Sequence, residues 1–235
     1  MLIMSKDSKK ITLNFGVLAV ATLICLCIVC FRIVYAGKTG YIFLVWNLFL
    51  AAVPFLFASA AEHFHYKKSA IGFWIFSFLW LIFFPNAPYI VTDFTHLRPL
   101  VLIGVPFWFD VVMIGSFAIT GILFGLCSLK IMGRIMFERL GAFGSWLCVV
   151  AVALVSGFGI YLGRYLRWNS WDIFFYPNEL FQDITERLSQ PLTYQQALFT
   201  SLLFAALVLC SYVVFSHFFD YKHSKKIKTQ RSELD

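Results

Sequence analysis

Long apolar stretches separated by short polar segments run through most of this chain. Six such stretches cover residues 11–35, 41–61, 70–89, 107–129, 144–163 and 195–217. Each has the about 20 residues that a helix needs to cross a hydrocarbon core, and none alternates with the period of two that marks a strand. Because only helices and closed barrels satisfy the backbone in lipid, the pattern predicts an all-α fold, a bundle of six transmembrane helices.

The Lys and Arg residues lie mostly on alternate connections between these stretches. They concentrate in the N-terminus at 1–10, in the connections after 61 and after 129, and in the tail at 218–235. Basic residues favour the cytoplasmic side of a membrane. We therefore expect a multi-pass protein of the cell membrane, with both termini cytoplasmic. The first stretch resembles a signal peptide in its basic start, but it is longer than the 7–15 residues of a signal core.

Composition supports a membrane protein and narrows the partners. Hydrophobic residues make up 60% of the chain, charged residues only 13%, and the mean hydropathy is +0.80. The formal net charge of +7 sits mainly on the proposed inner loops and tail, where it suits anionic inner-leaflet lipid better than nucleic acid. The lipid bilayer is thus the expected partner, and a protein partner stays open. We expect neither a cofactor nor a bound metal.

Polar residues gather just beyond the third stretch, on the predicted outer face. Pro85 and Pro88 should break the helix there, and the segment that follows carries candidate ligand-binding residues: Asn86, Tyr89, Thr92, Asp93 and His96. Asp93 and His96 are three residues apart and would share a face of a short helix. Two interpretations remain open: the pair takes part in ligand or proton chemistry, or Asp93 caps the short helix.

A second polar group follows the fifth stretch on the same predicted face. Its candidate residues are Arg164, Arg167, Asn169 and Asp172, and Asp110 begins the fourth stretch nearby. The two arginines should share one helical face, and Asp110 is the expected partner of Arg164. An arginine here can form a structural network, bind a ligand carboxylate or phosphate, or extend to lipid head groups, and all three interpretations stay open.

Three smaller patterns bear on packing. Asn47, within the second stretch, is placed to hydrogen-bond to a neighbouring helix. Pairs of glycines four residues apart, Gly121 with Gly125 and Gly159 with Gly163, permit close helix contact. Residues 177–189 predict a short amphipathic helix on the outer surface, with Leu180 on its apolar face.

Two long runs resemble the signature of a bacterial membrane-protein family, the one known as domain of unknown function 1361. They are Phe84-Pro85-Asn86-Ala87-Pro88-Tyr89-Ile90-Val91-Thr92-Asp93 and Gly163-Arg164-Tyr165-Leu166-Arg167-Trp168-Asn169-Ser170-Trp171-Asp172. The resemblance extends over roughly residues 41–217 and also includes Asn47 and Pro54. It implies a multi-pass membrane protein and no particular activity, substrate or catalytic residue.

Three classes of function therefore stay open. In the first class, the outer polar residues form a site that binds or transports a small polar or phosphate-bearing ligand. In the second, they serve a membrane enzyme acting on lipid or cell-envelope glycan, although the chain contains no recognisable catalytic motif. An accessory protein would use the same residues only to hold its fold. These classes differ in geometry: a binding site is open, and a structural network is paired and closed.

Overall fold

Helices form nearly all of the described chain, and no strand occurs among the described residues. The computed structural model describes residues 4–97 and 105–232, and the side chains of residues 15–97 and 105–217. The helices in order are α1 (Met4–Ala36), α2 (Phe43–Tyr66), α3 (Ala70–Phe83), α4 (Asn86–Tyr89), the 3₁₀ helix η1 (Ile90–His96), α5 (Phe107–Tyr165), α6 (Asp172–Phe175), α7 (Pro177–Ser189) and α8 (Gln195–Ser232). The all-α prediction is confirmed for these residues.

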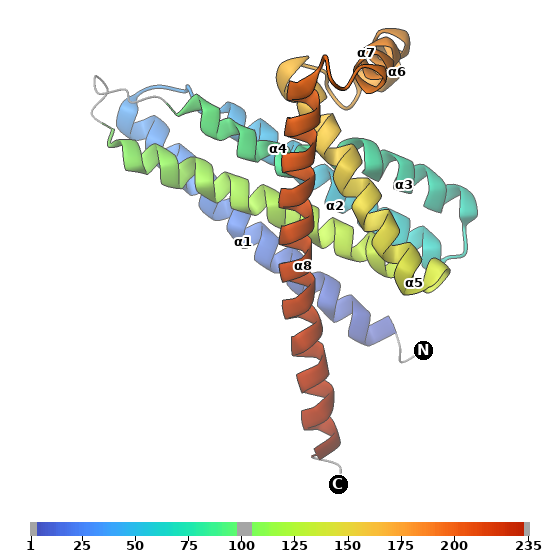
Figure 1. Cartoon of the computed structure of the whole chain (residues 1–235). Helices are drawn as coiled ribbons and strands as arrows, with labels where there is room; N and C mark the ends of the chain where they lie inside the picture. Colours follow the sequence, from blue (N-terminus) through green and yellow to red (C-terminus); the bar gives the residue numbers. More distant parts are fainter. Residues whose placement is uncertain (1–3, 98–104, 233–235) are drawn as a thin grey trace.

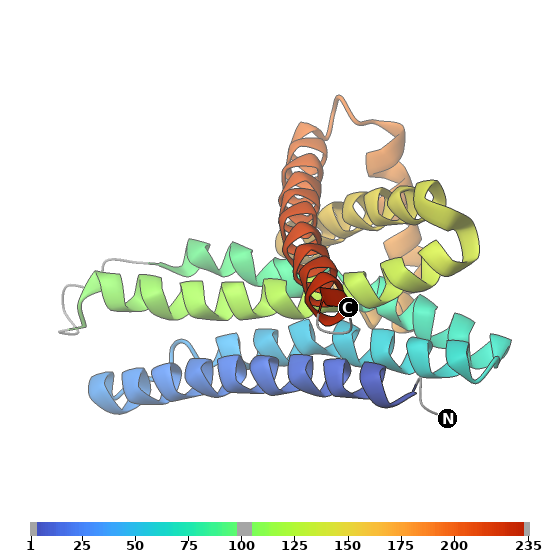
Figure 2. The ribbon, with the colours of Figure 1, turned by 90° about the horizontal axis from the view of Figure 1, so that it is seen from below.

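The first layer of the fold consists of α1, α2 and the first part of α5, which lie side by side in Figures 1 and 2. Their shared core is apolar: Val29 of α1, Leu48 and Phe55 of α2, and Met113 and Phe117 of α5 are all buried. The opposite faces of these helices expose large apolar side chains, for example Leu23 and Phe49. A helix that is apolar on every side suits an environment of protein on one face and lipid on the other.

The long helix α5 turns back on itself at Gly141. This residue has φ of 72° and ψ of −173°, which are not helical angles. Ser145 Oγ donates a hydrogen bond of 2.8 Å to the Gly133 carbonyl, although a straight helix would separate these residues by about 18 Å. The chain therefore reverses direction, as Figure 1 shows for the green and yellow parts of α5. The expected stretches 107–129 and 144–163 lie on opposite sides of this turn.

The segment from Phe84 to Ile90, which begins the first signature run, is held between the two halves of α5. On one side, a Cβ at Gly121 would lie 3.0 Å from the Ala87 carbonyl oxygen, and one at Gly125 would lie 2.9 Å from Ala87 Cβ. Only glycine lets the backbones approach this closely. The first predicted glycine pair thus marks a real close contact.

The second glycine pair contacts the same segment from the other half of α5. A Cβ at Gly159 would lie 2.7 Å from Pro85 Cγ, and one at Gly163 would lie 3.3 Å from Tyr89 Cε2. The prolines thus contribute packing surface. The expected break takes the form of a change of helix type, because α3 ends at Phe83 and gives way to α4 and η1 while the backbone angles stay helical. The first signature run is a packing centre of the fold.

Helix α8 crosses the first layer steeply and packs along α5 (Figures 1 and 2). The contact is closest at Gly157, where a Cβ would lie 2.1 Å from the Ser201 carbonyl oxygen. Further along, Tyr212 and Ala205 join the buried cluster that includes Val149 of α5. The two halves of α5 and α8 therefore form one packed unit.

Five helices among the described residues are long and apolar enough to span a membrane: Phe15–Ala36, Phe43–Tyr66, Ala70–His96, Phe107–Tyr165 and Gln195–His217. The last coincides with an expected stretch. The third continues to His96 rather than ending at 89, because the Pro85–Pro88 segment keeps helical backbone angles. The fourth is α5, which contains two expected stretches, one on each side of Gly141. The basic side chains of 1–10 and 218–235 lie outside the described side chains.

Candidate functional site

The predicted site residues lie at the end of the molecule where α1 and the second half of α5 end and where α2 and the first half of α5 begin. We call it the Arg164 end. Contacts link the helix ends there: Arg164 of α5 reaches His96 of η1, and the His96 ring lies 4.8 Å from the ring of Phe43 at the start of α2. The opposite end, where α2 ends and α5 turns, we call the Glu62 end. The polar residues at the Arg164 end form separate small groups.

The first group is a buried ion pair. Arg32 Nε donates to Asp110 Oδ1 at 3.1 Å and Arg32 Nη2 donates to Asp110 Oδ2 at 3.3 Å, and the two side chains are only 3% and 7% exposed. The Arg32 guanidinium also lies 4.9 Å from the centre of the Tyr41 ring. The expected pairing of Asp110 with Arg164 is wrong. Arg32 takes this place because α1 runs beside the first part of α5.

Asp93 forms the second group with α2. The Asn47 side-chain amide donates to Asp93 Oδ2 at 2.8 Å, and Asp93 is 1% exposed. The expected hydrogen bond from Asn47 to a neighbouring helix is confirmed. Asp93 lies within η1 and makes no capping bond, so the capping interpretation is wrong. This carboxylate ties η1 to α2.

Arg164 forms the third group, and its recorded partners are neutral. Its Nη1 lies 3.3 Å from His96 Nε2, and its Nη2 donates to Thr95 Oγ1. Since an arginine can only donate, Nε2 must accept, and the His96 ring in this contact is neutral. Arg164 also lies close enough to Asp93 for a Coulombic interaction, but it forms no ion pair with a carboxylate among the described residues. The guanidinium is half-buried and the His96 side chain is exposed.

The two signature runs meet at Asn86. Its side-chain amide donates to the Phe83 carbonyl at 2.9 Å and to Ser170 Oγ at 2.8 Å. Asp172 accepts two hydrogen bonds from Asn169, at 2.7 Å from the backbone and 3.1 Å from the side chain. These contacts close the turn between α5 and α6. Three predicted site residues, Asn86, Asn169 and Asp172, thus make hydrogen bonds that stabilise the fold.

Tyr89, Thr92 and Arg167 complete the predicted set. Tyr89 packs on Gly163, whereas the buried hydroxyl of Thr92 has no hydrogen-bond partner among the described residues. Arg167 is exposed and adopts a left-handed backbone with φ of 62°. Because α5 ends at Tyr165, Arg164 and Arg167 do not share a helical face, and that expectation is wrong.

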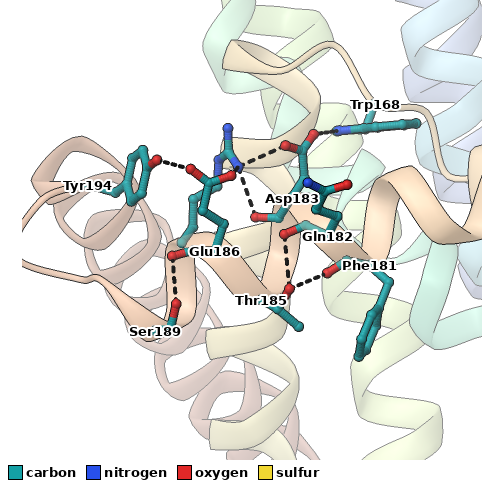
Figure 3. Close-up of polar contacts among 9 residues, drawn as sticks. Trp168, Phe181, Gln182, Asp183, Thr185, Glu186, Ser189 and Tyr194 are labelled. Atoms are coloured by element: carbon teal, nitrogen blue, oxygen red, sulfur yellow. Dashed lines mark hydrogen bonds and ion pairs between the residues drawn. The ribbon is translucent and has the colours of Figure 1, made fainter.

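A polar clamp that the sequence patterns did not reveal holds α7 against the ends of α5 and α8 (Figure 3). Trp168 Nε1 donates to Asp183 Oδ2 at 2.7 Å, and Arg187 Nη1 donates to Asp183 Oδ1 at 2.8 Å. Tyr194, which precedes α8, donates to Glu186. We call Trp168, Asp183, Glu186, Arg187 and Tyr194 the α7 clamp. The spacing of four between Asp183 and Arg187 was its only signal in the sequence.

Electrostatic interactions within the α7 clamp stabilise the protonated forms of Arg187 and Tyr194. Burial lowers the pKa of Arg187, but a hydrogen bond with Tyr161 and the neighbouring carboxylates of Asp183 and Glu186 raise it, and the net shift is upward. The hydrogen bond to Glu186 is the main reason why the pKa of Tyr194 is raised. The guanidinium of Arg187 stays charged, so α7 is bound to the bundle by charge-assisted bonds.

A further polar group lies at the Glu62 end. Glu62 is 3% exposed and forms an ion pair with Arg134. His65 lies between two charged residues, with Nε2 3.0 Å from Glu138 and Nδ1 3.1 Å from Arg139. Sequence patterns did not connect these residues, because the contacts depend on α2 lying beside the first half of α5.

The polar groups at the Arg164 end are of two kinds, buried carboxylates that are hydrogen-bonded within the protein and basic side chains that are partly exposed. The carboxylates of Asp93, Asp110 and Asp172 are buried and hydrogen-bonded, which leaves them poorly placed for acid–base chemistry. Arg164 instead presents a partly exposed positive charge in contact with His96, and Arg167 is exposed in the connection that follows α5. Such a charge suits an anion.

Helical composition and span-length helices together define the class: an all-helical protein with several helices able to cross a membrane. Residues 46–226 match the family model described as "Protein of unknown function (DUF1361)", and the chain belongs to this family. The match includes both signature runs and confirms the resemblance seen in the sequence. No curated protein and no solved structure matches the chain significantly.

Proposed function

We propose that this protein crosses the cell membrane six times, has cytoplasmic termini, and binds an anionic, phosphate-bearing group at Arg164 on its outer face. Three observations support the six crossings. Gly141 reverses α5, and each half of α5 exceeds the about 20 residues of a span. The start of α1 and the end of α8 point toward the bottom of Figure 1, away from α6 and α7. Connections rich in Lys and Arg also alternate along the chain with connections that contain few of them.

The main support for the binding site is the environment of the Arg164 side chain. Its guanidinium is fixed by His96 and Thr95, which contribute no negative charge, and among the described residues it forms no ion pair with a carboxylate. A planar, pre-oriented guanidinium binds phosphate oxygens through two parallel hydrogen bonds. Arg167, three residues further along the chain, is a second cation, exposed in the connection that follows α5.

The enzyme alternative is less well supported than binding. It requires Asp93 or Asp172 to reach a substrate as an acid, a base or a metal ligand. Asp93 is 1% exposed and is bonded to Asn47, and Asp172 is 9% exposed and is bonded to Asn169. Catalysis by these carboxylates would first require the closed groups to open.

Binding is tested with the full-length protein in lipid nanodiscs made of zwitterionic lipid. Two probes separate the sources of phosphate: inorganic phosphate, and a short-chain phosphatidylglycerol below its micelle concentration. Since charge-assisted hydrogen bonds contribute about 1.5–3 kcal/mol, Arg164→Gln should weaken binding of the preferred probe by about tenfold or more. Arg164→Lys should lose part of the affinity, because it keeps the charge but not the fork.

The matched control for charge is Lys38→Gln. Lys38 is an exposed cation in the connection between α1 and α2. The Lys38→Gln variant should bind both probes as tightly as the original protein does. Equal affinity in Arg164→Gln, or an equal loss in Lys38→Gln, would overturn the site.

Topology is tested separately by thiol labelling in intact cells. Ser189→Cys places a thiol on the exposed side of α7. An impermeant reagent should label it without permeabilisation. Labelling only after the membrane is opened would reverse the orientation and remove the outer-face site.

A further inference from the structure

Helix α7 presents three distinct sides. The first faces the bundle: Leu180 is buried in a cluster with Tyr161, Leu162 and Ala197, and Arg187 is drawn toward the same side by the clamp. A helix turns about 100° per residue, which places Leu180, Asp183 and Arg187 on one side. This side is occupied by protein.

The second side is apolar but uncovered. Phe181 is 68% exposed and Leu188 is 64% exposed. They are seven residues apart, about two turns, and therefore share a face next to the bundle-facing side. The third side carries the exposed polar residues Gln182, Thr185 and Ser189. A surface helix in water would need only a protein side and a polar side.

Three sides of this kind fit a helix at the rim of a membrane bundle. Protein lies on one side of such a helix, the acyl boundary of the leaflet on the second and water on the third. The elements that flank α7 in the chain also expose large apolar residues: Phe175 of α6 is 71% exposed, Leu192 is 82% exposed, and Phe199 in the first turns of α8 is 66% exposed. Phe199 belongs to a candidate span, and only residues 190–194 separate α7 from the helix that contains it.

We infer that α6 and α7 form an interfacial element whose Phe181 and Leu188 insert into the leaflet at the Arg164 end. The α7 clamp sets the rotation of the helix about its own axis. Trp168 and Arg187 both bind Asp183, which fixes the bundle-facing side, and Phe181 points away from these contacts (Figure 3). This element does not depend on Arg164 binding an anion.

The test places a photoreactive benzoylphenylalanine at single positions of the full-length protein in lipid nanodiscs. Substitution of Phe181 or Leu188 should give covalent lipid adducts on illumination, detected by the mass of the intact protein. Substitution of Gln182 or Ser189, which are exposed on the water side, provides the matched control and should give several-fold fewer adducts. Thermal melting of each variant checks that it is folded.

Each remaining outcome would overturn the inference. Equal adduct yields at all four positions would mean that α7 has no lipid-facing side. Cross-links from position 181 to a second copy of the chain would mean that protein covers this face. An absence of lipid adducts at 181 and 188 in folded variants would place α7 away from the leaflet, whatever the phosphate-binding experiment shows.

Discussion

Arg32 and Asp110 form a buried ion pair with two hydrogen bonds between α1 and α5. The pair stands at the Arg164 end of the molecule, where the Tyr41 ring covers the guanidinium. Because both charges are removed from water, their mutual contact must compensate for their lost hydration. Helix α1 also contacts the bundle through apolar side chains such as Leu18 and Val29. The ion pair therefore sets the position of α1 along α5.

Removal of one partner of this ion pair should lower the stability of the protein far more than removal of both charges. Arg32→Gln leaves a buried carboxylate unpaired and should cost about 3–5 kcal/mol, seen as a lower melting temperature in nanodiscs. The double variant Arg32→Gln with Asp110→Asn removes both charges and should recover much of this loss. If Arg32→Gln alone melts like the original protein, the ion pair does not hold α1.

Gly157 should tolerate no larger residue. A Cβ there would lie 2.1 Å from the Ser201 carbonyl oxygen and 3.1 Å from the Ala205 backbone nitrogen, so α8 would have to move. We expect Gly157→Ala to destabilise by about 1–3 kcal/mol, the usual cost of overpacking.

Gly16→Ala provides the control for the same chemical change. Gly16 lies in α1, where a Cβ would meet nothing within 4 Å. Alanine favours a helix by up to about 1 kcal/mol over glycine, so this variant should melt at the same or a higher temperature. Equal effects of the two changes would contradict the close α5–α8 contact.

The fold was more predictable from the sequence than the site was. Apolar length alone gave the positions of α2 and of the span Gln195–His217, because hydrocarbon thickness fixes how long a span must be. The glycine pairs also indicated real contacts. Sequence patterns could not show that Asp110 pairs with Arg32, since the pairing depends on which helices are neighbours and how each is rotated. The α7 clamp was missed for the same reason: Trp168 and Tyr194 belong to different connections.

The backbone at Arg167 is strained, and glycine should relieve it. A left-handed conformation costs a residue with a side chain about 1–2 kcal/mol, and Arg167 has φ of 62°. Arg167→Gly should therefore raise stability by up to about 1 kcal/mol in thermal melting. Lys68, with φ of 57° at the end of α2, offers a matched Lys68→Gly variant that should behave alike. Marked destabilisation by Arg167→Gly alone would show that the arginine side chain holds the turn.

Tyr194 should give the α7 clamp a dependence on alkaline pH. Its hydrogen bond to Glu186 is the main cause of its raised pKa, and the ordinary value is about 10. Because the folded protein binds this proton more tightly than the unfolded chain does, the contribution to stability is complete below about pH 10 and is lost as pH rises through the folded pKa. Tyr194→Phe keeps the ring beside Arg187 but removes the proton, so the difference in melting temperature between the two proteins should shrink above pH 10. A constant difference across this range would show that Tyr194 is not coupled to Glu186.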